Sequence, residues 1–246
     1  MNSVAGSASA GGFGGEAGAR LPGVKSVKHP LTRALLVLTF TTGLVDAVSY
    51  LGLGRVFTAN MTGNVVLLGF GVAGSGGLPV VGPALSLAAF LLGSVAGGAL
   101  VKRLQKRHPM LLARGLAIEV SLLAAAAIVA SATNVRPGDA MAYAVIVLLA
   151  FAMGVRGTIV RHMGVPDLST VVLTMTLTAF ASGSPLAGGS REDSIRRLAA
   201  ALAMFAGAVA GALLLKTSLV LPLAVAAALA LVTWLVYVPP AVRRGK

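Results

Sequence analysis

The chain has 246 residues, of which 57% are hydrophobic and only 11% charged, whereas about a quarter of an ordinary soluble domain is charged. Its mean hydropathy of +0.90 indicates a protein of the lipid bilayer, and its basic residues stand between apolar runs, which argues against a nucleic-acid-binding face despite a net charge of +13. Because it has no cysteine, the sequence excludes disulfides, thiolate metal sites and cysteine nucleophiles.

The first part of the chain, residues 1–29, is rich in Gly, Ala and Ser and has too little apolar surface to fold alone. We expect a disordered cytoplasmic tail there. The apolar stretch at 33–53 follows basic residues, so it can also be interpreted as a signal peptide. At about 20 residues it exceeds the roughly 7 to 15 of a cleavable signal core, which favours a retained helix.

Six stretches are long and apolar enough to cross a bilayer core of roughly 30 Å, which takes about 20 helical residues. They run over about 33–53, 79–101, 110–131, 139–160, 197–215 and 219–238. Two further stretches, 56–74 and 167–184, are shorter and rich in hydroxyl and amide side chains, as expected of segments that face protein or water. The sequence therefore predicts an all-α membrane protein with six transmembrane helices and two re-entrant or broken polar helices.

Basic residues predict the topology, because Lys and Arg concentrate in cytoplasmic loops. They occur before the first stretch, at 102–107 and at the C-terminus. Arg156 and Arg161 precede the second polar stretch, and Arg191, Arg196 and Arg197 follow it. Cytoplasmic charges before and after a part of the chain require an even number of crossings between them. Each polar stretch is therefore expected to enter and leave the membrane on the same side. We expect a bacterial inner-membrane protein with both termini inside; the rival topology has eight crossings.

The two halves of the chain match each other at offsets of 111 to 114 residues. With three crossings in each half, the second half is upside down relative to the first, which predicts two inverted repeats over about 33–131 and 139–238. They form one membrane domain, 30–241, followed by a basic tail, 242–246. The matched positions are Gly43 with Gly154, Thr58 with Thr170, Thr62 with Thr174, Asn64 with Thr176, Gly93 with Gly207, and Gly97 with Gly211.

Two carboxylates are predicted to lie well inside the spans. At about 1.5 Å per helical residue, Asp46 is roughly 20 Å from Arg33 and Glu119 is roughly 14 Å from Met110. A carboxylate inside a membrane is costly and usually faces a partner or a cavity, so both are candidates for proton coupling, Asp46 foremost. The bland alternative is a buried ion pair, of Asp46 with Arg55 or Arg156 for instance, that only fixes helix packing.

The polar stretches supply a candidate pathway, because hydroxyl and amide groups can replace the hydration of a small solute or ion. Threonines four residues apart in each stretch would share one helix face, although threonine also bonds to its own helix. The paired Gly-x-x-x-Gly patterns at Gly93, Gly97, Gly207 and Gly211 predict close helix packing. The predicted pathway consists of Asp46, Thr58, Asn60, Thr62, Asn64, Thr170, Thr174 and Thr176.

Enzymatic and cofactor sites are not expected. His108 and His162 lie in basic segments without Cys, Asp or Glu at ligand spacing, so no metal site is predicted. No nucleotide-binding loop occurs. Ser182-Gly183-Ser184 is faintly similar to an intramembrane serine hydrolase, but no histidine lies within a predicted span to act as its base.

Three motifs resemble the YoaK-like family of bacterial membrane proteins, a domain of unknown function. They are Gly43-Leu-Val-Asp46-Ala, the run Phe57-Thr-Ala-Asn-Met-Thr-Gly-Asn64, and Gly164-Val-Pro-Asp-Leu-Ser-Thr170, and the similarity covers about 33–238. The resemblance implies a six-helix integral membrane protein and no established substrate or catalytic residue. The chain departs from the family pattern at Gly157, where an Asn is usual, and at Met175, where a Gly is usual.

These observations favour a transporter or channel that moves a small solute or ion through the interface of the repeats, with Asp46 favouring proton coupling. The alternative is a membrane scaffold or partner-binding subunit without transport activity. The expected surroundings are the lipid bilayer, with no nucleic acid and no cofactor, and the sequence is compatible with a homo-oligomer.

Overall fold

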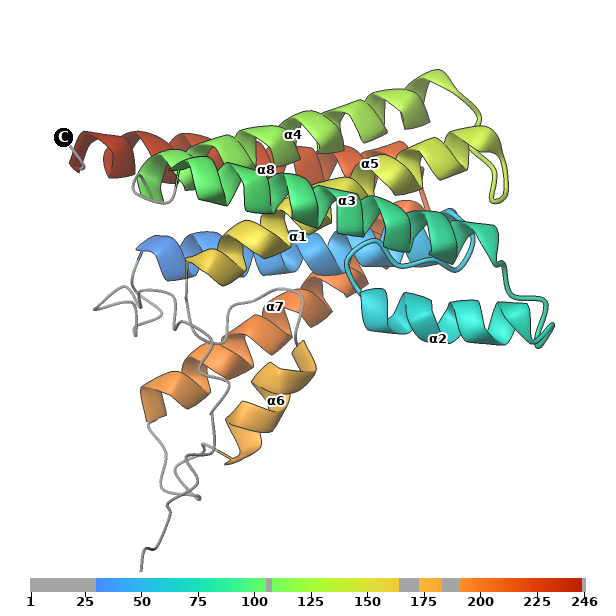
Figure 1. The fold of residues 1–246 in the computed structure, drawn as a ribbon, viewed down its shortest axis with the longest axis horizontal. Coiled ribbons are helices and arrows are strands. Elements are labelled where there is room, and N and C mark those ends of the chain that lie inside the picture. Colours follow the sequence, from blue (N-terminus) through green and yellow to red (C-terminus); the bar gives the residue numbers. More distant parts are fainter. Residues whose placement is uncertain (1–29, 105–107, 164–172, 183–190, 245–246) are drawn as a thin grey trace, which may run out of the picture.

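The computed structural model describes residues 30–104, 108–163, 173–182 and 191–244, which form eight helices and no strand within these ranges (Figure 1). The predicted N-terminal tail and Thr170 lie outside the described residues. The helices are α1 (Pro30–Gly52), α2 (Met61–Val72), α3 (Val81–Leu104), α4 (His108–Ala132), α5 (Ala140–His162), α6 (Leu173–Ser182), α7 (Arg191–Leu215) and α8 (Val220–Arg244).

Six of these helices are long and apolar enough to cross a membrane: α1, α3, α4, α5, α7 and α8. The shortest have 23 residues, about 35 Å of helix, against a bilayer core of roughly 30 Å. The predicted all-α class and its six spans are therefore confirmed. α2 has 12 residues and α6 has 10, and neither can cross.

Two helix boundaries differ from the expectation. α7 begins at Arg191 rather than near Arg197, because Glu192 and Asp193 in its first turn face the positive end of the helix dipole. Asp193 also pairs with Arg196 one turn later, at 3.1 Å. α8 continues to Arg244, so most of the predicted basic tail is helical.

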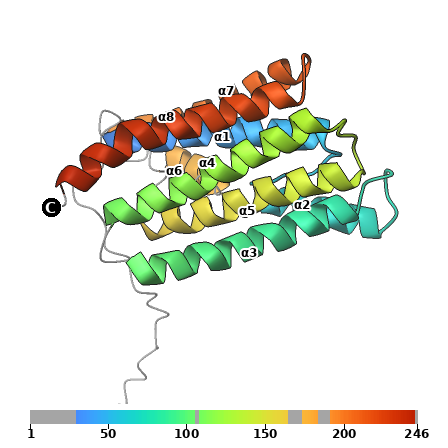
Figure 2. The same ribbon diagram turned by 90° about the horizontal axis from the view of Figure 1, so that it is seen from above.

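α1 and α5 are the central helices, with 67% of the residues in the apolar window of each buried in the protein. α3 packs along α5, α7 packs along α1, and α4 lies against both α5 and α8 (Figure 2). The main apolar core fills the space between α1, α4, α5 and α8. Polar side chains on α1 and α5 are consequently shielded from lipid.

Glycines permit the two closest helix crossings. A Cβ atom added at Gly43 or Gly207, where α1 crosses α7, would lie 2.1 or 2.0 Å from a backbone carbonyl oxygen of the other helix. The same distance is 2.2 Å for both Gly93 and Gly154, where α3 crosses α5. Only glycine allows backbones to approach in this way. Gly97 and Gly211 lie one turn further along the same crossings, against Val155 and Leu44 respectively.

The two crossings use corresponding residues of the two halves. The carbonyl groups that the glycines meet are those of Met204 for Gly43 and Phe90 for Gly154, and those of Phe151 for Gly93 and Phe40 for Gly207. Within each pair, the residues of one contact match those of the other at the offsets of 111 and 114 found in the sequence. In Figure 1, α1 and α5 run in opposite directions, as do α3 and α7, and α4 and α8. The first helix of each half thus packs against a helix of the other half in an exchanged way: α1 packs on α7, and α5 packs on α3.

The first polar stretch turns back into the bundle. After α1 ends, Gly54 (φ 105°) and Arg55 (φ 58°) adopt left-handed conformations that reverse the chain. The segment 53–60 then returns beside α1, where Phe57 stacks on Tyr50 with ring centroids 4.8 Å apart. α2 runs outward again, and α3 starts at the end where α1 stopped (Figure 1). This stretch therefore enters and leaves on the same side, as the charge pattern predicts.

Candidate functional site

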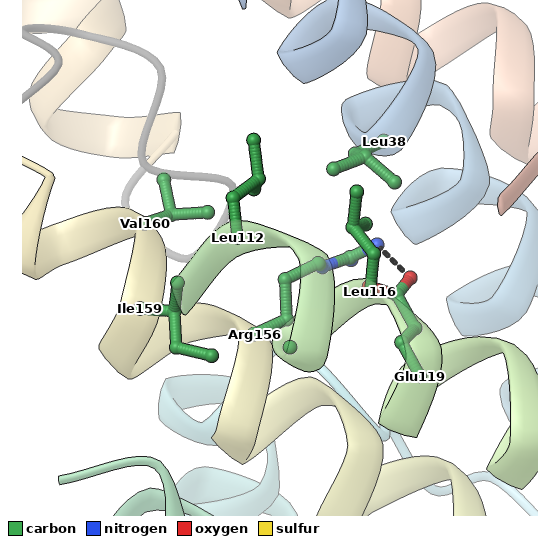
Figure 3. Close-up of a pocket in the computed structure, with 8 residues that line it drawn as sticks. Leu38, Leu112, Leu116, Glu119, Arg156, Ile159 and Val160 are labelled. Carbon is green, nitrogen blue, oxygen red and sulfur yellow. Dashed lines mark hydrogen bonds and ion pairs between the residues drawn. The ribbon is translucent and has the colours of Figure 1, made fainter. Parts of the chain in front are cut away.

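Arg156, on the buried face of α5 six residues before its end, is the centre of a polar network between α1, α4 and α5, and Figure 3 shows its contact with Glu119. Its Nη1 donates to Glu119 Oε1 of α4 at 2.7 Å and to Thr41 Oγ1 of α1 at 3.2 Å. Its Nη2 donates to Thr42 Oγ1 and contacts Met153 Sδ at 2.9 Å. Arg156 is 3% exposed and Glu119 is 1% exposed, so the ion pair lies away from solvent and lipid.

The two threonines hold the guanidinium group in place. The hydroxyl groups of Thr41 and Thr42 each donate to the carbonyl oxygen of Leu38, at 2.8 Å. This leaves their lone pairs to accept from Arg156. Because both hydroxyl groups are fixed to the α1 backbone, the position of the guanidinium is set from the α1 side and not by Glu119 alone.

A small cavity adjoins the ion pair. It has about 10 Å³ of space for the centre of a water-sized molecule, about what one water requires. Glu119 and Arg156 supply its polar lining, and Glu119 Oε2 and Arg156 Nε are buried with no hydrogen-bond partner in the described structure. The rest of the lining is Leu38, Leu112, Gly115, Leu116, Ile159 and Val160.

Asp46 holds the segment that turns back into the bundle. Its Oδ1 accepts the backbone N–H groups of Thr58 at 3.0 Å and Ala59 at 2.8 Å. Asp46 lies about 9 Å before the end of α1, so these bonds fix the depth that the segment reaches. Asp46 Oδ2 and the Thr58 hydroxyl are buried and have no hydrogen-bond partner among the described residues.

Asn64 fastens the same segment to α2 and α3. Its Oδ1 accepts Phe57 N–H at 2.9 Å, and its Nδ2 donates to Phe57 O at 2.6 Å and to Ser86 Oγ at 3.1 Å. Ser86 in turn donates to Phe57 O at 2.6 Å. Asn64 and Ser86 are fully buried. This arrangement satisfies the non-helical backbone of the segment, which lipid could not do.

The site contains more negative than positive charge. The buried charged residues in the described part of the chain are Asp46, Glu119, Arg156 and Arg196, and Arg196 pairs with Asp193 in the first turns of α7. Glu119 forms the ion pair with Arg156, whereas Asp46 has no ion-pair contact among the described residues and accepts two backbone N–H groups instead. A buried carboxylate without a charged partner costs several kcal/mol, so Asp46 is a candidate site for a proton or a cation.

Comparison with known proteins places this architecture. The family model described as "Protein of unknown function (DUF1275)" matches residues 34–236. The chain belongs to the DUF1275 family. It is also 33% identical, over 146 residues, to UPF0700 transmembrane protein YoaK of Bacillus subtilis (strain 168), an alignment that covers 59% of this chain and 63% of that protein. The match thus spans less than two thirds of that relative's length. No solved structure matches the chain.

In this DUF1275 protein the structure brings together only part of the predicted pathway. Asp46, Thr58 and Asn64 are buried around the returning segment. Asn60 and Thr62 are exposed, and Asn60 caps the N-terminus of α2 by accepting Gly63 N–H at 3.2 Å. The prediction that Thr58 and Thr62 share a helix face is wrong, because α2 begins only at Met61 and Thr58 precedes it.

The described part of the second polar stretch follows the pattern of the first except at the position of Asp46. Its described helix, α6, packs against α7. Thr176, the counterpart of Asn64, is 4% exposed, whereas Thr174 is exposed. Asp46 has Gly157 as its counterpart, so the second half carries no carboxylate at the position that holds the returning segment in the first.

Sequence reasoning misassigned Arg156 and missed its partners. It counted Arg156 among the loop charges that set the topology, whereas the structure buries it six residues before the end of α5. The suggested partner of Asp46 was Arg156 or Arg55, but Arg156 pairs with Glu119 and Arg55 is exposed. A usable signal was present, since an arginine inside an otherwise apolar 23-residue stretch needs a buried acceptor.

Proposed function

We propose that this protein moves a small solute or ion across the membrane and that the movement is coupled to protonation of Asp46 and Glu119. The observation that carries the proposal is the presence of two buried carboxylates, of which Glu119 pairs with Arg156 while Asp46 has no ion-pair contact among the described residues. A proton that binds and leaves is the smallest charge that can balance such a site, and ionisable groups inside membrane spans commonly form proton relays.

The positions of the two carboxylates support a route through the site. Asp46 holds the returning segment, which opens toward the end of the bundle where α1 stops. Glu119 lines the cavity whose other residues lie toward the beginning of α1 and α4 and the end of α5. Arg156 lines the same cavity and also contacts Thr42, about one helical turn before Asp46 on α1. A transported group that passes through the interior of the bundle would, on this proposal, meet both carboxylates.

The proposal is tested with purified protein in liposomes that contain a pH-sensitive dye, under an inward pH gradient. Small cations, small anions and neutral solutes are added in turn. We expect one class to accelerate proton entry, and we expect Asp46→Asn and Glu119→Gln each to abolish that acceleration. Asp139→Asn is the matched control, because Asp139 is an exposed carboxylate at the start of α5. If no solute changes proton entry in wild-type protein relative to these two variants, the transport proposal is wrong and the scaffold alternative is favoured.

A further inference from the structure

We propose that Arg156 is the binding site for a small monovalent anion, such as formate or nitrate, which takes the place of the Glu119 carboxylate once Glu119 is protonated. This inference rests on the proposed function and names the substrate class of the same site. It is carried by the unequal anchoring of the two charged partners and by the cavity beside them.

The arginine is fixed, whereas the glutamate is not. The guanidinium group of Arg156 has three hydroxyl or thioether acceptors besides Glu119, on Thr41, Thr42 and Met153. Glu119 has Arg156 as its hydrogen-bond partner, through Oε1 alone, and its Oε2 is buried without one among the described residues. A protonated Glu119 would lose its charge attraction, and its side chain could leave while the guanidinium stays in place.

The cavity provides the space and selects the charge. With about 10 Å³ of free space beside the ion pair, it becomes large enough for a few heavy atoms only when the carboxyl group of Glu119 moves aside. Its walls are leucine, isoleucine and valine side chains, so nothing in the lining other than Arg156 can neutralise an anion. A divalent anion would keep one unbalanced charge there and is excluded.

The charges balance in both states. Before binding, the Arg156 cation and the Glu119 carboxylate cancel. After binding, a proton is on a Glu119 carboxyl oxygen, and the Arg156 Nη1–H group released from Glu119 Oε1 donates to the anion. One proton and one anion therefore enter together, and the net charge of the site does not change.

Few other ionisable groups face Glu119 from the helices around it. α5 supplies Arg156, α1 supplies Asp46 beyond it, and α4 itself carries Arg114, which is exposed. α8, which packs along α4, has no ionisable side chain from Val220 to Trp234, and the charges of α3 are Lys102 and Arg103 in its last turn. Protonation of Glu119 is thus the event expected to create the anion site.

The test measures binding to the full-length protein in detergent. Glu119→Gln keeps the shape of the side chain and removes its charge, so this variant should bind formate or nitrate at every pH. Saturating anion should raise its Tm by about 5 to 10 °C, whereas gluconate and sulfate should not. The exposed Ser121, two residues along α4, gives the control variant Ser121→Ala, which should behave as wild type.

Wild-type protein provides a second measurement that does not need a variant to fold. Because linkage is reciprocal, formate added to weakly buffered protein should cause uptake of about one proton per anion bound. The inference is overturned if formate binds without proton uptake, if it does not bind, or if Glu119→Gln/Arg156→Met still shows the Tm increase. If the protein binds formate but formate drives no proton entry in liposomes, the anion site is supported and the proposed transport function is wrong. If only cations drive proton entry, the transport function is supported and the anion site is wrong.

Discussion

Replacing Gly93 by alanine should weaken the crossing of α3 and α5. The added Cβ would lie 2.2 Å from the carbonyl oxygen of Phe151, whereas even the tightest real contacts of a Cβ are near 3.0 Å. The two helices would have to separate by roughly 1 Å, and overpacking of this kind costs typically about 1 to 3 kcal/mol. Gly98, five residues further along α3, has no atom within 4 Å of its ideal Cβ.

Gly98→Ala is therefore the matched control, because it makes the same chemical change in the same helix without a clash. Both variants gain the same helix propensity from alanine, so their difference isolates the crossing. In detergent, we expect the Tm of Gly93→Ala to lie about 2 to 12 °C below that of Gly98→Ala. Gly207→Ala should lose a similar amount, because its Cβ would meet the carbonyl of Phe40 in the same way. Equal stability of the Gly93 and Gly98 variants would refute this account of the helix packing.

Three further predictions concern the site and the topology. Arg156→Met should be less stable than wild type by about 3 to 5 kcal/mol, because Glu119 is left buried without its partner, and denaturant unfolding should show part of that loss restored in Arg156→Met/Glu119→Gln. Asn64→Leu should destabilise the returning segment and increase its hydrogen exchange, whereas Thr62→Val, two residues away and exposed, should leave exchange unchanged. Ser75→Cys should react with a membrane-impermeant thiol reagent in intact cells, where the cysteine-free parent gives no background; reaction only after lysis would reverse the proposed orientation.

Much of the fold could be predicted from the sequence, because crossing a bilayer imposes a length and a composition on each helix. The apolar stretches identified all six spans, and the basic residues near Lys102 required the first polar stretch to return to the side it entered. The start of α7 was missed because its first turn is charged. That turn is stabilised by its acidic residues and its ion pair, which hydropathy does not detect.

The candidate site was harder to predict, because it depends on which helices touch. Asp46 and Glu119 could be found from their cost in lipid, but the pairing of Glu119 with Arg156 requires α4 to pack on α5. Thr41 and Thr42 look in the sequence like threonines bonded to their own helix, which they are, and their second role as acceptors for Arg156 needs α5 beside them. Asn60 was assigned to the pathway, whereas it caps the N-terminus of α2. The sequence alone does not distinguish an asparagine that caps a helix from one that lines a pathway.

The exchanged packing of the halves has a consequence for how the chain is made. α1 is released into the membrane early in synthesis, but its closest partner, α7, begins only at Arg191. At about 5 to 20 residues per second, translation needs roughly 10 to 30 s to cover that interval. During this delay the face of α1 around Phe40 and Gly43, which finally packs on α7, lacks its partner. We therefore expect the insertion machinery or a chaperone to retain α1 until the second half of the chain arrives.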